Sequence, residues 1–344
     1  MTRKVLFAIH RNERGGMQGA LKNTAQIFSE LGWEPYTIAL YKTKRNIDFH
    51  TPTTHISTDE STPIELDTLC AEILKVSPDL IVSFSCSEIH LVNLDFPIIE
   101  RVALLSVYSP QAIHQIIARS KNLVALVAQS ISLMKILSSL NQDRNLPVRC
   151  IPNFVHLFVR ESVYTTQDRE ILKVIAIARN HPVKNLKALC DVARECPSIS
   201  FTIVTDNSIA DIPPNISEFI NIDEDKVTDL LKNSDLYINL SFKEGISNAT
   251  LRAFSHGLPA ILTDIDGIIW HLLGNAWVVD SFSVMPQNKR YSQNIKQIAS
   301  WINQLSLDKE TRLKMGQKSH QVAQHFNKQY VHKLWEDLVL ELFE

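Results

Sequence analysis

Residues 236–268 read LYINLSFKEGISNATLRAFSHGLPAILTDIDGI, and this stretch indicates a strand, a helix and a second strand. Residues 236–240 and 259–263 are apolar runs of strand length, whereas residues 248–256 have the spacing of an amphipathic helix. Continuously apolar strands that alternate with helices are typical of a parallel sheet covered on both faces. The stretch therefore predicts an α/β fold.

The same alternation extends over the chain in both directions. In the first half, strands are predicted at 4–10, 35–41, 79–85, 102–108, 123–128 and 148–152. In the second half, they are predicted at 173–178, 200–205, 218–222, 236–240, 259–263 and 276–279. Helical patterns between them include 18–31, 66–76, 129–140, 185–195, 225–234, 248–256 and 266–273. The end of the chain is predicted to be helical at 290–305, 308–325 and 328–343.

A polar interruption divides this alternation into two halves. We expect two Rossmann-like domains at 1–154 and 173–325, joined by a linker at 155–172. A terminal helix at 326–344 follows, and packing back on the first domain is one expected arrangement for it. Ligands of open α/β sheets bind beyond the carboxyl ends of the strands. We therefore expect functional residues just after strands, in a cleft between the two domains.

The composition is that of a folded, globular chain. It has 344 residues, of which 45% are hydrophobic and 21% charged. The formal net charge of −2 argues against nucleic-acid binding through overall charge. No signal peptide and no apolar run of about 18 residues is found, so we expect a cytoplasmic protein. The five cysteines form no C-x-x-C motif, which favours free thiols over a disulfide or a metal site.

The glycines gather in two regions that each follow a predicted strand. Seven of the nine lie either at 15–19 or at 245–274. The first region opens a helix, where free N–H groups suit an anion or a sugar hydroxyl, and its candidate residues are Gly15, Gly16 and Gln18. A tight turn between strand and helix explains each glycine there equally well. Dinucleotide binding is not expected, because the second strand ends in Leu40-Tyr41-Lys42 and not in an acid.

Two cations follow the first strand of the second half. Arg179 and Lys184 are separated by a turn that contains a proline and no glycine, so this connection cannot cradle a phosphate through its backbone. An arginine that grips phosphate oxygens and a lysine that adds a point charge can together neutralise a diphosphate. Lys184 also precedes a helix, where a cation is slightly unfavourable unless an anion is bound.

The quoted stretch resembles the donor-site signature of family 4 glycosyltransferases of the GT-B fold. That signature is S-x-x-E-G-x-x-N-x-x-x-E-A-x-x-x-G-x-P followed by T-D-x-x-G. The matching positions are Ser241, Glu244, Gly245, Asn248, Ala253, Gly257, Pro259, Thr263, Asp264 and Gly267. Arg179 and Lys184 also correspond to the R-x4-K pair of that family, and Gly15-Gly16 to its N-terminal glycine loop. The resemblance covers nearly the whole chain.

The resemblance implies a retaining transfer, without a metal, of a sugar from a nucleoside-diphosphate sugar to a hydroxyl acceptor. Arg179, Lys184 and Glu244 are the implied catalytic residues. The implied donor-binding residues are Gly245, Ile246, Ser247, Asn248, Arg252, Asp264 and Gly267. The acceptor, a sugar or a lipid-linked sugar, would belong to the N-terminal domain, and the product to surface polysaccharide, lipopolysaccharide or another glycoconjugate. Peripheral contact with the inner face of a membrane is a further expectation, for which the basic run at 42–45 is a candidate.

Two departures from the family pattern bear on this prediction. Arg252 stands where the signature has its second glutamate, which binds the ribose diol, and a guanidinium offers no acceptor for hydroxyl protons. Either the ribose is held otherwise, or the donor differs, or donor binding has been lost. The region after the predicted fourth strand also lacks the histidine that many members carry, and His90 and His114 are only weak candidates for that role. The alternative function is therefore a non-catalytic partner or scaffold subunit.

Two acidic or histidine clusters are predicted not to bind a metal. Asp223-Glu224-Asp225 precedes a helix, where N-capping explains the acids. His320 and His325 are not spaced four residues apart and have no carboxylate pair nearby, so no zinc site is expected.

Overall fold

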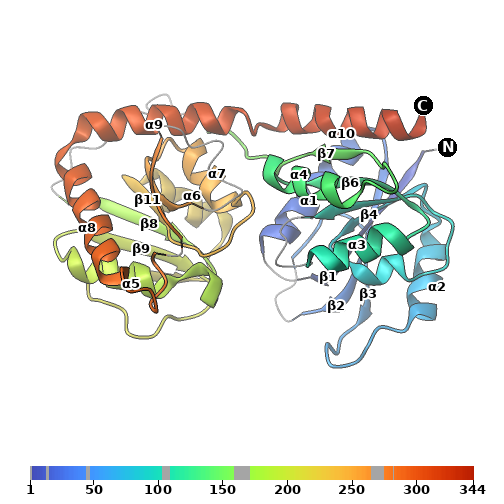
Figure 1. The fold of residues 1–344 in the computed structure, drawn as a ribbon, viewed down its shortest axis with the longest axis horizontal. Helices are drawn as coiled ribbons and strands as arrows, with labels where there is room; N and C mark the ends of the chain where they lie inside the picture. Colours follow the sequence, from blue (N-terminus) through green and yellow to red (C-terminus); the bar gives the residue numbers. More distant parts are fainter. Residues whose placement is uncertain are drawn as a thin grey trace. The chain divides into compact units, whose positions relative to one another are not determined.

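The computed structural model describes residues 2–12, 15–43, 47–102, 109–158, 171–264, 275–281 and 283–344. Its contacts divide the chain into two compact units. Unit 1 comprises Met1–Phe154 together with Lys328–Glu344, and unit 2 comprises Val155–Asn327. Each unit is built around one parallel sheet with helices on its faces (Figure 1). The last helix thus belongs to the unit formed by the start of the chain.

The sheet of unit 1 has seven strands in the order β3-β2-β1-β4-β5-β6-β7, all paired in parallel. The strands are β1 (Lys4–Asn12), β2 (Glu34–Lys42), β3 (Thr53–Ser57), β4 (Leu80–Phe84), β5 (Ile98–Val102), β6 (Leu123–Ala128) and β7 (Val148–Cys150). The helices are α1 (Gly16–Glu30), α2 (Leu66–Val76), the 3₁₀ helix η1 (Ser87–His90), α3 (Pro110–Arg119), α4 (Ile131–Leu140) and α10 (Lys328–Phe343).

Two strands of unit 1 differ from the sequence prediction. Of the strand expected at 102–108, the structure describes only Val102, which is the last residue of β5 as described; residues 98–101 of β5 were not predicted, and residues 103–108 lie outside the described part of the chain. The sequence misled here because Glu100 and Arg101 interrupt the apolar pattern, although both are buried within β5. The strand β3 was not predicted, because its sequence TTHIS is polar and it lies at the edge of the sheet.

The sheet of unit 2 has six parallel strands in the order β10-β9-β8-β11-β12-β13. The strands are β8 (Lys173–Ile177), β9 (Ser200–Thr205), β10 (Ile216–Ile220), β11 (Leu236–Asn239), β12 (Ala260–Thr263) and β13 (Ala276–Val279). The helices are the 3₁₀ helix η2 (Pro182–Lys184), α5 (Leu186–Glu195), α6 (Glu224–Lys232), α7 (Asn248–Ser255), α8 (Tyr291–Leu307) and α9 (Lys309–Gln324). The helix expected at 266–273 lies outside the described residues.

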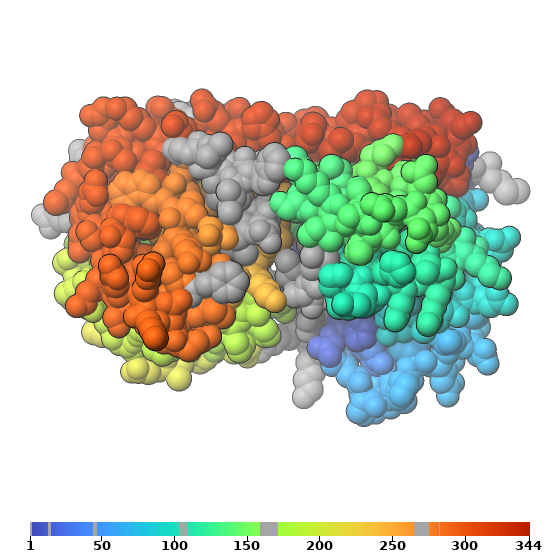
Figure 2. Space-filling model, viewed as in Figure 1, coloured from blue at the N-terminus to red at the C-terminus, as the bar shows by residue number. Residues whose placement is uncertain are grey.

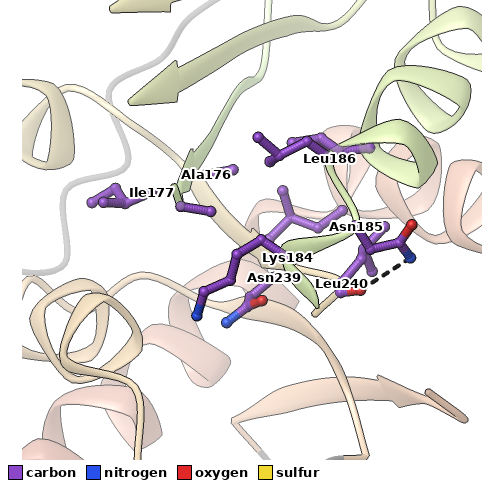
Figure 3. Close-up of a pocket in the computed structure, with 10 residues that line it drawn as sticks. Ala176, Ile177, Lys184, Asn185, Leu186, Asn239 and Leu240 are labelled. Carbon is purple, nitrogen blue, oxygen red and sulfur yellow. Dashed lines mark hydrogen bonds between the residues drawn. The ribbon is translucent and has the colours of Figure 1, made fainter. Parts of the chain in front are cut away.

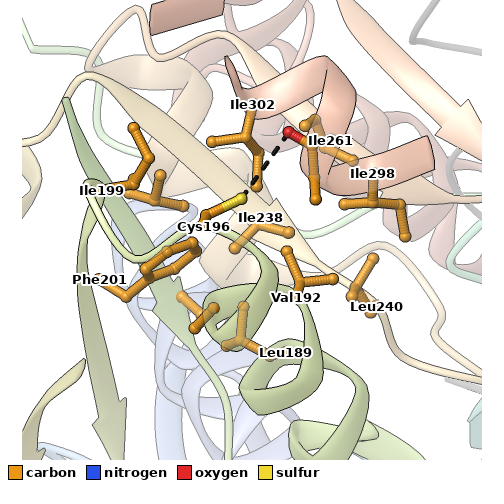
Figure 4. Packing of buried hydrophobic residues seen from close by; sticks show 14 of the residues in the cluster. Leu189, Val192, Cys196, Ile199, Phe201, Ile238, Leu240, Ile261, Ile298 and Ile302 are labelled. Atoms are coloured by element: carbon orange, nitrogen blue, oxygen red, sulfur yellow. Dashed lines mark hydrogen bonds between the residues drawn. The ribbon is translucent and has the colours of Figure 1, made fainter. Parts of the chain in front are cut away.

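One of the two hydrophobic clusters of unit 2 lies between its sheet and the helices α5 and α8, and the other includes residues of α6, α7 and α9. Figure 4 shows Leu189 and Val192 of α5 and Ile298 of α8 meeting strand residues such as Ile238. The thiol of Cys196 lies among them, 3.7 Å from the carbonyl oxygen of Ala299. Burial of each such side chain contributes about 1.5–3 kcal/mol to the stability of the fold. This packing holds in place the sheet from which the functional loops extend. All five cysteines lie within the described residues and are free, as the sequence predicts.

Helix α10 completes the core of unit 1. Its residue Trp335 is fully buried and packs edge-on against Phe28 of α1, with ring centroids 5.5 Å apart. The guanidinium of Arg101 lies 5.9 Å from the centre of the Trp335 ring, and Arg149 forms an ion pair with Glu341. In the space-filling view, the red surface of α10 borders the green surface of the segment around α4 and β7 (Figure 2). The terminal helix is therefore an integral part of this unit.

Candidate functional site

The order of strands in unit 2 marks one place as a potential binding site. The chain leaves β8 through α5 to β9 on one side, and later returns to β11 on the other side. The carboxyl ends of β8 and β11 therefore form a topological switch point, where open α/β sheets bind ligands. A pocket occupies this position (Figure 3). Its lining residues are Ala176, Ile177, Ala178, Lys184, Asn185, Leu186, Leu189, Ile238, Asn239 and Leu240.

Lys184, which lines this pocket, forms an ion pair with Glu244. The ammonium of Lys184 contacts Oε1 of Glu244, and the two side chains are only 20% and 13% exposed. Ser241 Oγ lies 2.6 Å from Asn239 Oδ1 and 3.2 Å from Glu244 Oε1, so its single proton can serve one of them at a time. The structure thus brings together two of the three predicted catalytic side chains, from loops sixty residues apart in the sequence.

The two loops that carry this pair are tied to each other. The backbone N–H of Phe242 donates to the carbonyl of Val183, over 2.8 Å. Asn185 has a φ of 52°, and its side-chain amide donates to the carbonyls of Leu240 and Val284, over 3.2 and 3.1 Å. Sequence reasoning missed Asn185. The signal for it was available, because asparagine adopts the left-handed conformation more readily than other side-chain-bearing residues and occurs here directly before a helix.

The start of helix α7 lies next to Glu244. Ser247 caps the helix, since its hydroxyl accepts from the N–H of Thr250 over 3.3 Å. Ile246 is buried beneath the loop. The hydroxyl of Tyr237 accepts from Thr250 Oγ1 over 3.4 Å, and burial raises the pKa of Tyr237 well above its usual value. That hydroxyl therefore stays protonated and neutral. Gly245 lies between Glu244 and the cap, and Asn248 is the first residue of the helix.

Arg252 contacts a different acid. Its guanidinium forms an ion pair with Glu224, the first residue of α6, and Nη2 lies 3.4 Å from Thr228 Oγ1. The carboxylate of Glu224 is held there although its side chain is 68% exposed. The N-cap expected from the acidic run before α6 is present, because Asp223 accepts from the N–H of Lys226 over 2.7 Å.

The remaining predicted residues of unit 2 occupy separate positions. Arg179 is exposed and lies on the connection between β8 and α5, with its carbonyl accepting from the N–H of His181. Asp264 follows β12, and its carboxylate accepts from the N–H of Ser281 over 2.5 Å. This bond gives Asp264 a structural role in joining two loops. Gly267 lies outside the described residues.

The predicted residues of unit 1 lie at the start of α1. Gly15 is the N-cap residue and Gly16 the first residue of the helix. Gln18 is buried, and its amide donates to the carbonyl of Arg11 over 2.9 Å, which joins α1 to the end of β1. His114 is exposed on α3. The side chain of His90 is only 4% exposed and contacts Glu100, so His90 belongs to the packed interior.

No group of three or more potential metal ligands comes together among the residues that the structure describes. Within those same residues, no helix combines the length and the apolar character that crossing a membrane requires.

Comparison with known protein families finds one match, which covers most of unit 2. Residues 172–299 match the family described as "Glycosyl transferases group 1", and this segment contains the switch point and the Lys184–Glu244 pair. No curated protein matches the chain.

Solved structures resemble the chain over nearly its whole length. Sucrose-phosphate synthase from Thermosynechococcus elongatus matches with a TM-score of 0.79 and 12% identity, over 99% of each chain. The pneumococcal O-GlcNAc transferase GtfA, in complex with UDP and GlcNAc, matches with a TM-score of 0.77 and 10% identity, over 99% of this chain and 100% of that one. HepE from Anabaena, in complex with UDP and glucose, matches with a TM-score of 0.76 and 14% identity, over 98% and 100%. These likenesses confirm the predicted GT-B fold.

Proposed function

We propose that this chain, a glycosyltransferase of group 1 with the GT-B fold, transfers a sugar from a nucleoside-diphosphate sugar to a hydroxyl acceptor with retention of configuration. The observation that carries the proposal is the Lys184–Glu244 ion pair at the switch point of unit 2. It provides a cation for a leaving phosphate and an acid for sugar hydroxyls within one built site.

The charges of this site suit a diphosphate leaving group. When the bond to the sugar breaks, negative charge develops on the phosphate, and a cation held in place stabilises that charge. Lys184 is such a cation, and Arg179 supplies a second one from the same connection. In the unliganded protein, Glu244 balances the charge of Lys184. A bound diphosphate takes over that role, which leaves the Glu244 carboxylate to accept hydrogen bonds from hydroxyl groups of the sugar. The chemistry needs no metal ion.

UDP is the first nucleotide to test. Of the three structurally similar proteins named above, HepE and GtfA are described as complexes with UDP. A thermal-shift series with UDP, GDP, ADP and CMP examines the proposal directly. A nucleotide at a hundred times its dissociation constant stabilises the protein by roughly 2.7 kcal/mol. Melting curves that none of the four nucleotides changes would contradict the proposal and favour the non-catalytic partner or scaffold subunit.

A substitution at Lys184 tests the site itself. Lys184→Ala is expected to weaken binding of the stabilising nucleotide at least about tenfold, because a charge-assisted contact contributes about 1.5–3 kcal/mol. Lys187→Ala is the matched control, since Lys187 lies three residues further along, 65% exposed and paired with Asp191. Equal affinities in the two variants would remove Lys184 from the site. Arg179→Ala is expected to cost a similar factor in affinity or rate.

The Arg252–Glu224 pair supports one of the alternatives for the ribose. Arg252 cannot accept hydroxyl protons, but it holds Glu224, whose exposed carboxylate can accept them. We therefore assign the ribose-binding acid to α6. Glu224→Gln is expected to weaken nucleotide binding about tenfold, and Arg252→Gln to weaken it through loss of the positioned acid. Tighter binding by Arg252→Glu would contradict this assignment and show that the arginine only impairs the site.

The acceptor and the biological role follow from the family resemblance. We assign the acceptor, a sugar or a lipid-linked sugar, to unit 1, and the product to surface polysaccharide, lipopolysaccharide or another glycoconjugate. A cytoplasmic location, with peripheral contact at the inner face of a membrane, belongs to the same proposal. Incubation of the protein with labelled UDP-sugars and a set of glycan acceptors, followed by mass spectrometry of the products, tests this part.

A further inference from the structure

Unit 1 has a switch point of its own. The chain proceeds from β1 to β2 and β3 on one side and then returns to β4 on the other side of β1. The carboxyl ends of β1 and β4 therefore form the second place in this chain where the topology of an open sheet favours a ligand. A transfer reaction has two substrates. The proposed function assigns the donor to the switch point of unit 2, and the proposal for unit 1 rests on that assignment.

A histidine and a glutamate from these two strand ends face each other. Nε2 of His10 lies 3.6 Å from Oε1 of Glu88, and the side chains are 42% and 22% exposed. The imidazole of His10 packs against the ring of Tyr41, with centroids 5.0 Å apart. Tyr41 is buried, and its hydroxyl donates to the carbonyl of Thr62 over 3.0 Å. The ring of Tyr41 thus supports the imidazole of His10, whose side chain remains 42% exposed.

The segment that carries Glu88 is held in a strained conformation by a buried acid. Ser85 has a φ of 52°, which costs a residue with a side chain free energy and persists only where the surroundings enforce it. Glu100, only 1% exposed, accepts from the N–H of Ser85 over 3.1 Å and contacts Nε2 of His90 over 2.9 Å. Nδ1 of His90 lies 2.9 Å from Ser120 Oγ. Both ends of the short segment are therefore fixed, and Glu88 is presented from a rigid support.

The distance within the pair indicates what it binds. At 3.6 Å, the two atoms are too far apart for a direct hydrogen bond. A hydroxyl group within reach of both would donate to the carboxylate and accept from the imidazole, since a hydroxyl is both donor and acceptor. The other oxygen of Glu88 accepts from Ser87 Oγ over 3.1 Å. The nearby charge of Arg11 is balanced by Glu60, 3.0 Å away. A phosphate would be repelled by Glu88.

We propose that His10 and Glu88 bind a hydroxyl group of a sugar acceptor at the switch point of unit 1. The carboxylate and the imidazole act as a hydroxyl-binding pair, so the acceptor is recognised through its hydroxyl groups, with the Glu88 charge selecting against an anion.

The test uses the full chain with isotope-labelled histidine, observed by NMR with and without UDP. The probes are the methyl α-glycosides of glucose, galactose, mannose and N-acetylglucosamine. At least one of them is expected to shift the His10 resonance in a saturable manner, and Glu88→Gln is expected to weaken that response at least about tenfold. His10→Ala assigns the resonance. The matched control is the pair of His50 and Asp48, which are 3.7 Å apart, highly exposed and located in the segment before β3.

The outcomes separate this inference from the proposed function. A His10 resonance that no glycoside shifts, in a protein that binds UDP, overturns the inference and leaves the donor site intact. An unchanged affinity in a folded Glu88→Gln variant, or an equal response of His50, also overturns it. Glycoside binding at His10 in a protein that binds no nucleotide would support the inference while contradicting the proposed transferase activity.

Discussion

Gly316, in the interior of α9, is a position where one added methyl group is expected to be costly. A Cβ at Gly316 would lie 2.3 Å from the carbonyl oxygen of Gly257, whereas ordinary contacts begin at 3.4 Å. Gly257 follows α7 with a φ of 69°, and its N–H donates to the carbonyl of Phe254 over 2.8 Å. The obstacle is thus backbone and not a flexible side chain. Gly316→Ala therefore requires α7 or α9 to move by about 1 Å, the difference between the two distances.

The magnitude follows from two opposing contributions. Overpacking costs about 1–3 kcal/mol, and a backbone obstacle places this case near the upper end. Replacing glycine by alanine inside a helix contributes about 1 kcal/mol in the favourable direction. We therefore expect Gly316→Ala to destabilise unit 2 by about 1–2 kcal/mol. Gly16→Ala is the matched control, because Gly16 is also helical but has no atom of the described structure within 4 Å of its Cβ position. It should be neutral or slightly stabilising.

The assay is urea unfolding of the full chain, with hydrogen exchange read separately for the two units. Separate readings are needed because a protein with two units does not have to unfold in one step. Gly316→Ala should lower the urea midpoint of unit 2 and leave unit 1 unchanged. If it is as stable as the parent protein, or less harmful than Gly16→Ala, the close approach of α7 and α9 is not the reason for this glycine.

Three further perturbations test other parts of the structure. Burial and the charge of Lys42 lower the pKa of His55 below its usual value of 6.5. The unfolded chain therefore binds more protons than the folded protein, and stability falls as the pH drops below 6.5. In thermal melts between neutral and mildly acidic pH, His55→Gln should reduce this loss of stability. Lys184→Met and Glu244→Gln, combined in a double-mutant cycle, should show a coupling free energy of about 1–3 kcal/mol in urea unfolding without nucleotide. Additive effects would show that the pair is not coupled. Glu100→Ala should lower the free energy of unfolding by about 3–5 kcal/mol because it leaves the buried partners of Glu100 unpaired. Glu100→Gln should be less harmful. Equal melting temperatures of the two variants and the parent protein would refute this reasoning.

Most of the fold could be predicted because its signals are local. Apolar runs of strand length, separated by amphipathic helices, mark a parallel sheet wherever they occur. The order of elements from β8 to β12 followed from this pattern alone. The prediction missed residues 98–101 of β5, which include the buried Glu100 and Arg101. Their partners come from distant segments, namely Ser85 and His90 for the acid, and Asn153 for the base, so no local pattern indicates that charged residues belong inside.

The candidate site was predictable only in part. The resemblance placed Lys184 and Glu244 in one site, and the structure brings them into contact. It did not indicate Asn185, which ties two loops together, nor that Arg252 is paired with Glu224. It also missed the His10–Glu88 pair. Each of these contacts joins segments that lie far apart in the sequence.

The sequence by itself determined the class of fold, the approximate positions of the strands, and the residues that supply charge after them, because hydrophobic periodicity and residue type act over a few neighbouring positions. Only the tertiary structure decided which charges meet. Strands far apart in the chain become neighbours in a parallel sheet, and their carboxyl ends then bring together loops whose side chains have no relation in the sequence. Arg252 shows this clearly: its replacement of an acid is visible in the sequence, but its contact with Glu224 depends on how α6 and α7 pack on one sheet.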